Sequence, residues 1–212
     1  MKRAIAAVAA PLAISMLAAP AHASEEDTQL WIFANTVVPM GDAATASLEL
    51  SPRFREGSDQ LLVRGTIDFR LSESVSAGGG AAFVEFAGGD EWRAFQQLTL
   101  STGQISLRTR VEERFFDGAD RAQIRLRQRV QVSFPVAKAT RLSGSAELLY
   151  IVQPESRLAD ARVDSWRGNL SLQRRLSPRM DAALGYLLIY SPRPGAPDRI
   201  SHVPQVTITF RP

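Results

Sequence analysis

Arginine residues recur at every second position in several segments of this 212-residue chain. The clearest run is Arg125, Arg127 and Arg129, which alternate with Leu126 and Gln128. In an extended strand, residues two positions apart lie on the same face. A guanidinium group donates paired hydrogen bonds to carboxylates and phosphates. The chemistry expected of such a face is therefore a network of ion pairs or the binding of anions.

The polar face of the predicted strands carries far more positive than negative charge. Alternation assigns fourteen arginines to it: Arg53, Arg55, Arg64, Arg70, Arg93, Arg108, Arg110, Arg114, Arg121, Arg125, Arg127, Arg129, Arg141 and Arg167. It assigns five carboxylates: Glu49, Asp68, Glu91, Glu112 and Glu147. Eight of these residues are predicted to form a charge network inside a barrel: Glu49, Arg64, Arg93, Arg110, Glu112, Arg125, Arg127 and Glu147.

Two interpretations of this network are open. It either satisfies buried charge through bidentate pairs or lines an anion-binding or anion-conducting lumen. Fourteen arginines against five carboxylates leave nine positive charges unmatched on that face. Because an unpaired buried charge is costly, water, anions or lipopolysaccharide phosphates at the rims are expected to compensate the excess.

Residues that could catalyse a reaction are nearly absent. The chain has no cysteine, which excludes disulfides, a thiolate nucleophile and cysteine-based metal sites. His202 would be the only histidine of the mature chain, so a multi-histidine metal site is excluded as well. A histidine there could activate a serine for lipid hydrolysis, but its same-face neighbours are Ile200 and Pro204. We therefore predict no catalytic, metal-binding or cofactor-binding residues, no cofactor and no enzymatic activity.

The first residues are typical of an export signal. Lys2 and Arg3 precede an apolar stretch over 4–19, and residues 21–23 form a small-x-small cleavage site. Cleavage after Ala23 would leave a single domain over 24–212 with 23 basic and 22 acidic residues, and hence a net charge of +1. Export and the dispersed arginines argue against nucleic acid as a partner.

The mature chain contains no apolar stretch long enough for a transmembrane helix. Instead, alternation with period two recurs in eleven segments, separated by turn residues. The segments are about 28–38, 44–55, 60–71, 74–86, 90–101, 104–115, 121–134, 140–152, 161–174, 179–190 and 200–211. The glycines at 78–80 lack the pattern of a phosphate-binding loop and are expected to permit close packing or curvature.

Aromatic residues distinguish a membrane barrel from a soluble β-sandwich with the same alternation. Phe54, Phe115, Tyr150 and Tyr190 end even-numbered segments, whereas Phe69, Phe134 and Phe210 end odd-numbered ones. All have the parity of the apolar face, so antiparallel strands would place them in two girdles. The longer connections, around 117–120, 154–160 and 191–198, all follow even-numbered segments and should face outside.

The pattern predicts an all-β fold: an antiparallel up-and-down transmembrane β-barrel of about 10–12 strands. Single-chain bacterial barrels have even strand counts. Eleven segments therefore suggest that one is missed, split or miscounted near Trp31. Pro204 also removes a ladder hydrogen bond from a strand that should help to close the barrel.

Several short motifs resemble the bacterial family known as domain of unknown function 2490. They are 29–31 (Gln-Leu-Trp), 108–115, 125–127, 145–148 and 184–186, with His202 before a terminal strand that ends in Phe210. Arg211 and Pro212 depart from a chain that ends in an aromatic residue. The resemblance covers most of the mature chain. It implies a small outer-membrane barrel and no particular reaction.

The favoured function is a bacterial outer-membrane barrel that serves as a structural protein or a narrow, anion-preferring pore. A lipid-modifying barrel enzyme and a soluble periplasmic β-sandwich binding module are the alternatives. The expected partners are outer-membrane lipids, lipopolysaccharide and the barrel-assembly machinery, with no nucleic acid. Oligomeric state and ligand stay open at this point.

Overall fold

The computed structural model describes residues 24–212, and the predicted signal peptide, 1–23, lies outside the described residues. Every regular element in this range is a strand, and no helix is long and apolar enough to cross a membrane. The strands are β1 (Glu25–Thr28), β2 (Leu30–Met40), β3 (Ala44–Phe54), β4 (Gln60–Arg70), β5 (Val75–Phe86), β6 (Gly89–Thr102), β7 (Ile105–Phe116), β8 (Gln123–Ala137), β9 (Thr140–Gln153), β10 (Arg162–Ser177), β11 (Met180–Ser191) and β12 (Arg199–Phe210).

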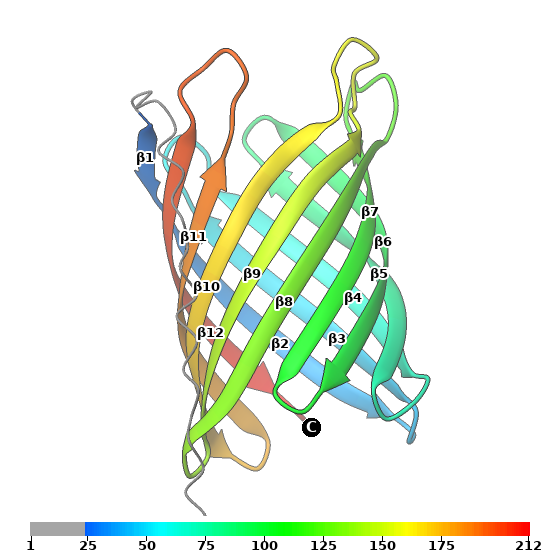
Figure 1. Ribbon diagram of the computed structural model, residues 1–212, viewed down its shortest axis with the longest axis vertical. Coiled ribbons are helices and arrows are strands. Elements are labelled where there is room, and N and C mark those ends of the chain that lie inside the picture. Colours follow the sequence, from blue (N-terminus) through cyan, green and yellow to red (C-terminus); the bar gives the residue numbers. More distant parts are fainter. Residues whose placement is uncertain (1–23) are drawn as a thin grey trace, which may run out of the picture.

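Strands β2 to β12 form one closed, eleven-stranded barrel (Figure 1). Each strand pairs antiparallel with the next, and β12 closes the sheet by pairing parallel with β2. A closed barrel leaves no sheet edge unpaired, as a membrane-spanning sheet requires. The predicted fold class is confirmed, and the single closed sheet excludes the β-sandwich alternative.

The expectation of an even strand count was wrong. An odd number of up-and-down strands makes the first and last strands run in the same direction, so their pairing must be parallel. The register of this pair places Trp31 opposite Gln205 and Thr36 opposite Phe210. The eleven alternating segments therefore correspond to the eleven strands of the barrel, and none was missed.

β1 continues β2 along the same side of β12. Thr28 lies opposite His202 and Trp31 opposite Gln205, so both pairings have the same register. The ladder is interrupted between them, where the Gln29 N–H donates to the His202 carbonyl at 2.9 Å. The second hydrogen bond of this parallel pair would run from the backbone N–H of residue 204 to the Gln29 carbonyl. Residue 204 is proline, which has no N–H. Pro204 thus accounts for the break between β1 and β2.

The polarity of the two faces of the sheet is the reverse of that in a soluble protein, because the outward face is apolar and the inward face is charged. Outward apolar side chains are exposed, with Leu184 at 67% and Leu170 at 57%. Inward charged side chains are buried, with Arg110 at 3% and Glu112 at 2%. An apolar exterior around a polar interior is the pattern of a barrel whose outer surface faces hydrocarbon.

Exposed aromatic side chains lie toward the two ends of the barrel. Phe54, Phe115 and Tyr190 are exposed at the ends of β3, β7 and β11, and Phe69, Phe134 and Phe210 near the ends of β4, β8 and β12. Two exposed tryptophans add to the first group. Trp92 lies opposite Phe115 and Trp166 opposite Tyr190. The long connections after β7, β9 and β11 share this end, at the top of Figure 1, and short turns occupy the other.

The glycine run on β5 permits three strands to approach closely. A Cβ at Gly78 or Gly80 would collide with the backbone of β4, and one at Gly79 would lie 2.7 Å from the Phe95 carbonyl oxygen of β6. At Gly80, the atom in the way is the carbonyl oxygen of Gly65. These glycines therefore serve close packing, as expected from the sequence.

Candidate functional site

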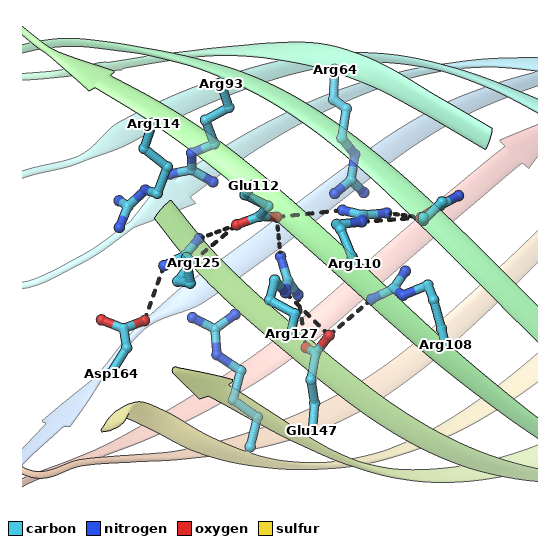
Figure 2. Close-up of polar contacts among 12 residues, drawn as sticks. Arg64, Arg93, Arg108, Arg110, Glu112, Arg114, Arg125, Arg127, Glu147 and Asp164 are labelled. Carbon is cyan, nitrogen blue, oxygen red and sulfur yellow. Dashed lines mark hydrogen bonds and ion pairs between the residues drawn. The ribbon is translucent and has the colours of Figure 1, made fainter. Parts of the chain in front are cut away.

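The interior of the barrel contains a carboxylate that joins three arginines. Glu112 of β7 accepts hydrogen bonds from Arg125 at 3.0 Å (Nε) and 2.6 Å (Nη2), and from Arg127 Nη1 at 2.8 Å. The Arg110 guanidinium lies 3.6 Å from the same carboxylate. Figure 2 shows these side chains converging from neighbouring strands. The carboxylate is buried, and its charge is compensated several times over.

A second carboxylate extends the network toward β9. Glu147 accepts hydrogen bonds from Arg127 Nη2 at 2.7 Å and from Arg108 Nη2 at 2.9 Å. Arg127 therefore bridges Glu112 and Glu147 (Figure 2). The register places Arg110 directly opposite Arg127, where like charges repel. The two carboxylates offset this repulsion.

The other predicted network residues form smaller groups within the lumen. Glu91 accepts hydrogen bonds from Arg93 Nε and from Arg114 Nε, both at 2.5 Å, and these two arginines lie opposite each other on β6 and β7. Glu49 of β3 pairs with Arg64 Nη2 of β4 at 2.6 Å. All eight residues proposed from the sequence face the interior, but their ion pairs and hydrogen bonds divide them among three clusters.

Two carboxylates of the interior, Asp164 and Asp181, were not predicted from the sequence. Asp164 has the parity of the outward face, but the register between β9 and β10 shifts at Val163 and Ser165. This β-bulge brings Asp164 Oδ2 to 2.9 Å from Arg125 Nη1. Asp181, near the opposite end of the barrel, forms an ion pair with Arg211. The alternation in the sequence could have placed Asp181 on the inward face. No residue type in the sequence indicates the β-bulge that turns Asp164 inward.

Four of the arginines that line the lumen form no ion pair within 4.0 Å with a carboxylate among residues 24–212: Arg53, Arg55, Arg129 and Arg167. The Arg53 guanidinium stacks 4.1 Å from the centre of the Trp31 ring, and its Nε is buried without a hydrogen-bond partner. Arg167 Nε donates only to the Ser165 hydroxyl, at 3.3 Å. These guanidinium groups have free hydrogen-bonding capacity toward the lumen.

A cavity of about 580 Å³ occupies the lumen among these clusters. Twelve arginines contribute to its wall: Arg53, Arg55, Arg64, Arg93, Arg108, Arg114, Arg125, Arg127, Arg129, Arg167, Arg193 and Arg199. Only four carboxylates do so: Glu49, Glu91, Glu147 and Asp164. The wall of the cavity is therefore strongly positive.

The loop end of the barrel has its own ion pairs. Glu25, at the start of β1, lies 2.8 Å from Arg193 Nη2 in the β11–β12 loop and 3.4 Å from Arg199 Nη2. The close ion pair with Arg193 holds the pKa of the Glu25 carboxyl below its ordinary value. These contacts fasten β1 to β12 beside the mouth of the cavity.

His202 lies on the outward face of β12, away from the cavity. The Tyr186 hydroxyl is 2.5 Å from its Nδ1, and a Glu26 carboxylate oxygen lies 4.0 Å from its Nε2. No serine stands beside it on its own strand, since positions 200 and 204 are Ile and Pro. Within residues 24–212, no group of three or more acidic or histidine side chains is arranged to hold a metal ion.

Comparison with known proteins agrees with this architecture. A family model described as protein of unknown function (DUF2490) matches residues 28–200 and confirms the resemblance found in the sequence. An uncharacterized protein of Methylorubrum extorquens is 26% identical over 193 residues, covering 82% of this chain and 84% of that protein. A solved structure of the NanC porin matches with a TM-score of 0.53 and 13% identity, over 76% of this chain and 81% of that one. This last likeness concerns the fold alone.

Proposed function

Because the chain belongs to the family of proteins of unknown function DUF2490 and folds as a barrel that resembles a porin, we propose that it is a bacterial outer-membrane protein. The exposed apolar face, the aromatic residues at both ends and the closed sheet support this placement. The predicted signal peptide supports export. In this arrangement the long connections face outside and the short turns face the periplasm.

We further propose that the lumen is a narrow, anion-preferring pore and that the protein is not an enzyme. The observation that carries this proposal is the cavity wall, with twelve arginines and four carboxylates. A passage lined by one sign of charge within low-dielectric walls concentrates the opposite ion. Eleven strands enclose a far smaller lumen than the 16–18 strands of large porins, and side chains fill much of it. The conductance should therefore be small.

Planar-bilayer recordings of the purified barrel test this proposal. We expect small conductance steps with a preference for chloride over potassium. Arg129 lies opposite Glu147 in the register but forms no ion pair within 4.0 Å, because Glu147 pairs with Arg108 and Arg127. Arg129→Gln therefore removes a cavity charge and should weaken the preference without breaking an ion pair. Arg179→Gln, in the exposed β10–β11 turn, is the matched control and should leave it unchanged. A large, cation-selective conductance would refute the proposal.

A purely structural barrel is the competing interpretation of the same lumen. The three clusters, one around Glu112 and Glu147, one around Glu91 and one around Glu49, would then only compensate buried charge. In that case the bilayer should be silent, while loss of Glu112 should still destabilise the fold. The two interpretations therefore differ in conductance and agree in stability.

One observation favours a lipid-modifying enzyme as a second candidate. Tyr186, His202 and Glu26 form a polar group on the outward face near the loop end, where outer-leaflet lipids would lie. Such a histidine could act as a base only if a nucleophile were within hydrogen-bonding reach of it. A phospholipase or lipid A modification assay on the wild type and His202→Ala tests this candidate. Activity that His202→Ala abolishes would establish it.

A further inference from the structure

One sector of the lumen wall is an apolar cluster, in a cavity whose other lining side chains are mostly charged or polar. Trp31 of β2, Val203 of β12, and Leu187 and Ile189 of β11 pack into a single buried cluster, with Phe33 against it. We call these four residues the apolar patch. Its Trp31, Leu187 and Ile189 also line the cavity. The patch exists only because the parallel closure of the barrel brings β2 beside β12.

Two arginines without carboxylate partners flank the apolar patch. On β3, Arg53 lies directly opposite Trp31. On β10, Arg167 lies directly opposite Ile189. Both arginines line the same cavity as Trp31, Leu187 and Ile189. An anion between them would satisfy both charges while lying beside the apolar patch.

We propose that this part of the lumen binds an organic anion with an apolar, preferably aromatic, body, and this inference rests on the proposed anion-preferring lumen. The acid group lies between Arg53 and Arg167, and the body packs on Trp31, Leu187 and Ile189. A guanidinium pair recognises an oxyanion by charge-assisted hydrogen bonds. The apolar side chains provide the second half of the recognition by removing apolar ligand surface from water.

The size and position of the cavity suit such a ligand. Its volume of about 580 Å³ lies within the range of small-molecule sites. Arg53 is the next-to-last residue of β3 and Ile189 lies two residues before the end of β11, so the site is near the loop end of the barrel. A ligand can therefore reach it from the side that the proposed orientation places outside.

The apolar patch also determines which acids are disfavoured. Hydroxyl groups of a polyhydroxylated acid such as gluconate would meet side chains of Trp31, Leu187 and Ile189 that offer almost no hydrogen bonds. A buried hydroxyl without a partner is costly. The site should therefore select aromatic acids over polyhydroxylated ones of similar charge.

Fluorescence of Trp31 provides a direct binding assay that does not depend on conduction. The chain has three tryptophans, and Trp92 and Trp166 lie on the exposed outer face, so a Trp92→Phe/Trp166→Phe background leaves Trp31 as the reporter. The probe is 4-nitrobenzoate, with 4-nitrobenzyl alcohol as its neutral analogue and gluconate as a polar competitor. We expect saturable quenching by the acid at concentrations at least tenfold lower than by the alcohol, and no competition by gluconate.

Variants locate the site. Arg53→Gln and Arg167→Gln, made singly, should each weaken binding of the acid about tenfold. Arg167→Gln should leave quenching by the alcohol unchanged. Arg53→Gln uncovers the Trp31 ring on which its guanidinium stacks, so quenching by the acid is compared with quenching by the alcohol in the same variant. Ile189→Thr should weaken binding of both, whereas the exposed Arg179→Gln should change neither. Heat-modifiable migration on a gel checks that each variant is folded, and a variant that fails is replaced by the other arginine variant.

Equal quenching by acid and alcohol, or an effect of Arg179→Gln as large as that of Arg53→Gln, would overturn the inference. Its failure is distinguishable from failure of the pore proposal. Binding without conductance would retain the site and reject the pore, whereas anion-selective conductance with unselective quenching would retain the pore and reject the site.

Discussion

Replacement of Glu112 by glutamine tests whether the charge network holds the barrel together. The substitution keeps the side-chain volume and one acceptor oxygen but removes the negative charge. Glu112 is 2% exposed and accepts three hydrogen bonds, from Arg125 and Arg127, with Arg110 close by. The variant would also direct an amide N–H₂ group toward guanidinium groups that can only donate.

The magnitude follows from what each arginine retains. Loss of one partner of a buried ion pair costs about 3–5 kcal/mol. Arg125 keeps Asp164 at 2.9 Å and Arg127 keeps Glu147 at 2.7 Å, so neither is left without a carboxylate. Arg110 loses its only carboxylate, 3.6 Å away, but keeps its two hydrogen bonds to Gln97 Oε1. The remaining amide oxygen and water in the cavity lower the cost further. We therefore expect the free energy of unfolding to fall by about 2–3 kcal/mol, below the full cost of a broken buried pair.

The assay is urea unfolding in detergent, with the folded fraction measured from heat-modifiable migration on a gel. Glu113→Gln is the matched control because Glu113 is the next residue of β7 and has outward parity, opposite Ala94 and Ile124. Its substitution should change the free energy of unfolding by no more than about 0.5 kcal/mol. An effect of Glu112→Gln no larger than that of Glu113→Gln would refute the structural importance of the network.

Three further substitution experiments test the fold and its orientation. Leu126→Arg should cost about 2–4 kcal/mol of unfolding free energy if this outward side chain of β8 faces lipid near the midplane, and tolerance of it would contradict that placement. Gly80→Ala should destabilise by about 1–3 kcal/mol because its Cβ meets backbone, whereas Gly168→Ala, which has open space, should cost far less. Leu158→Cys, in the β9–β10 loop, should react with an impermeant maleimide on intact cells and Ser177→Cys should not, and the reverse labelling would invert the topology.

Strict alternation explains why so much of the fold was predictable. Polar and apolar residues alternate with a period of two, which assigns each side chain to one face of its strand. In a single closed sheet the two faces are the lumen and the exterior, so alternation alone predicts which side chains face inward. Glu112 and Arg125 could thus be placed inside from parity alone, and the register then brings them opposite each other. The strand count was misjudged because an even number was assumed. Nothing in the sequence around Trp31 indicates that β2 pairs parallel with β12 to close the barrel.

The candidate binding site depends on features that the alternation of polar and apolar residues does not reveal. The bulge that turns Asp164 inward adds one residue to β10 without a distinctive residue type. The apolar patch joins Trp31 and Val203, which are far apart in the chain and meet only through the parallel closure. Which arginines lack a carboxylate also depends on side-chain reach across the lumen, as with Arg167. These are three-dimensional properties of the closed barrel.

The reversal potential of the wild-type barrel across a tenfold potassium chloride gradient tests the central proposal most directly. Twelve arginines and four carboxylates around the cavity should favour chloride as the permeating ion. We expect a reversal potential displaced toward the chloride equilibrium potential. A displacement toward the potassium equilibrium potential would contradict the proposal of an anion-preferring pore.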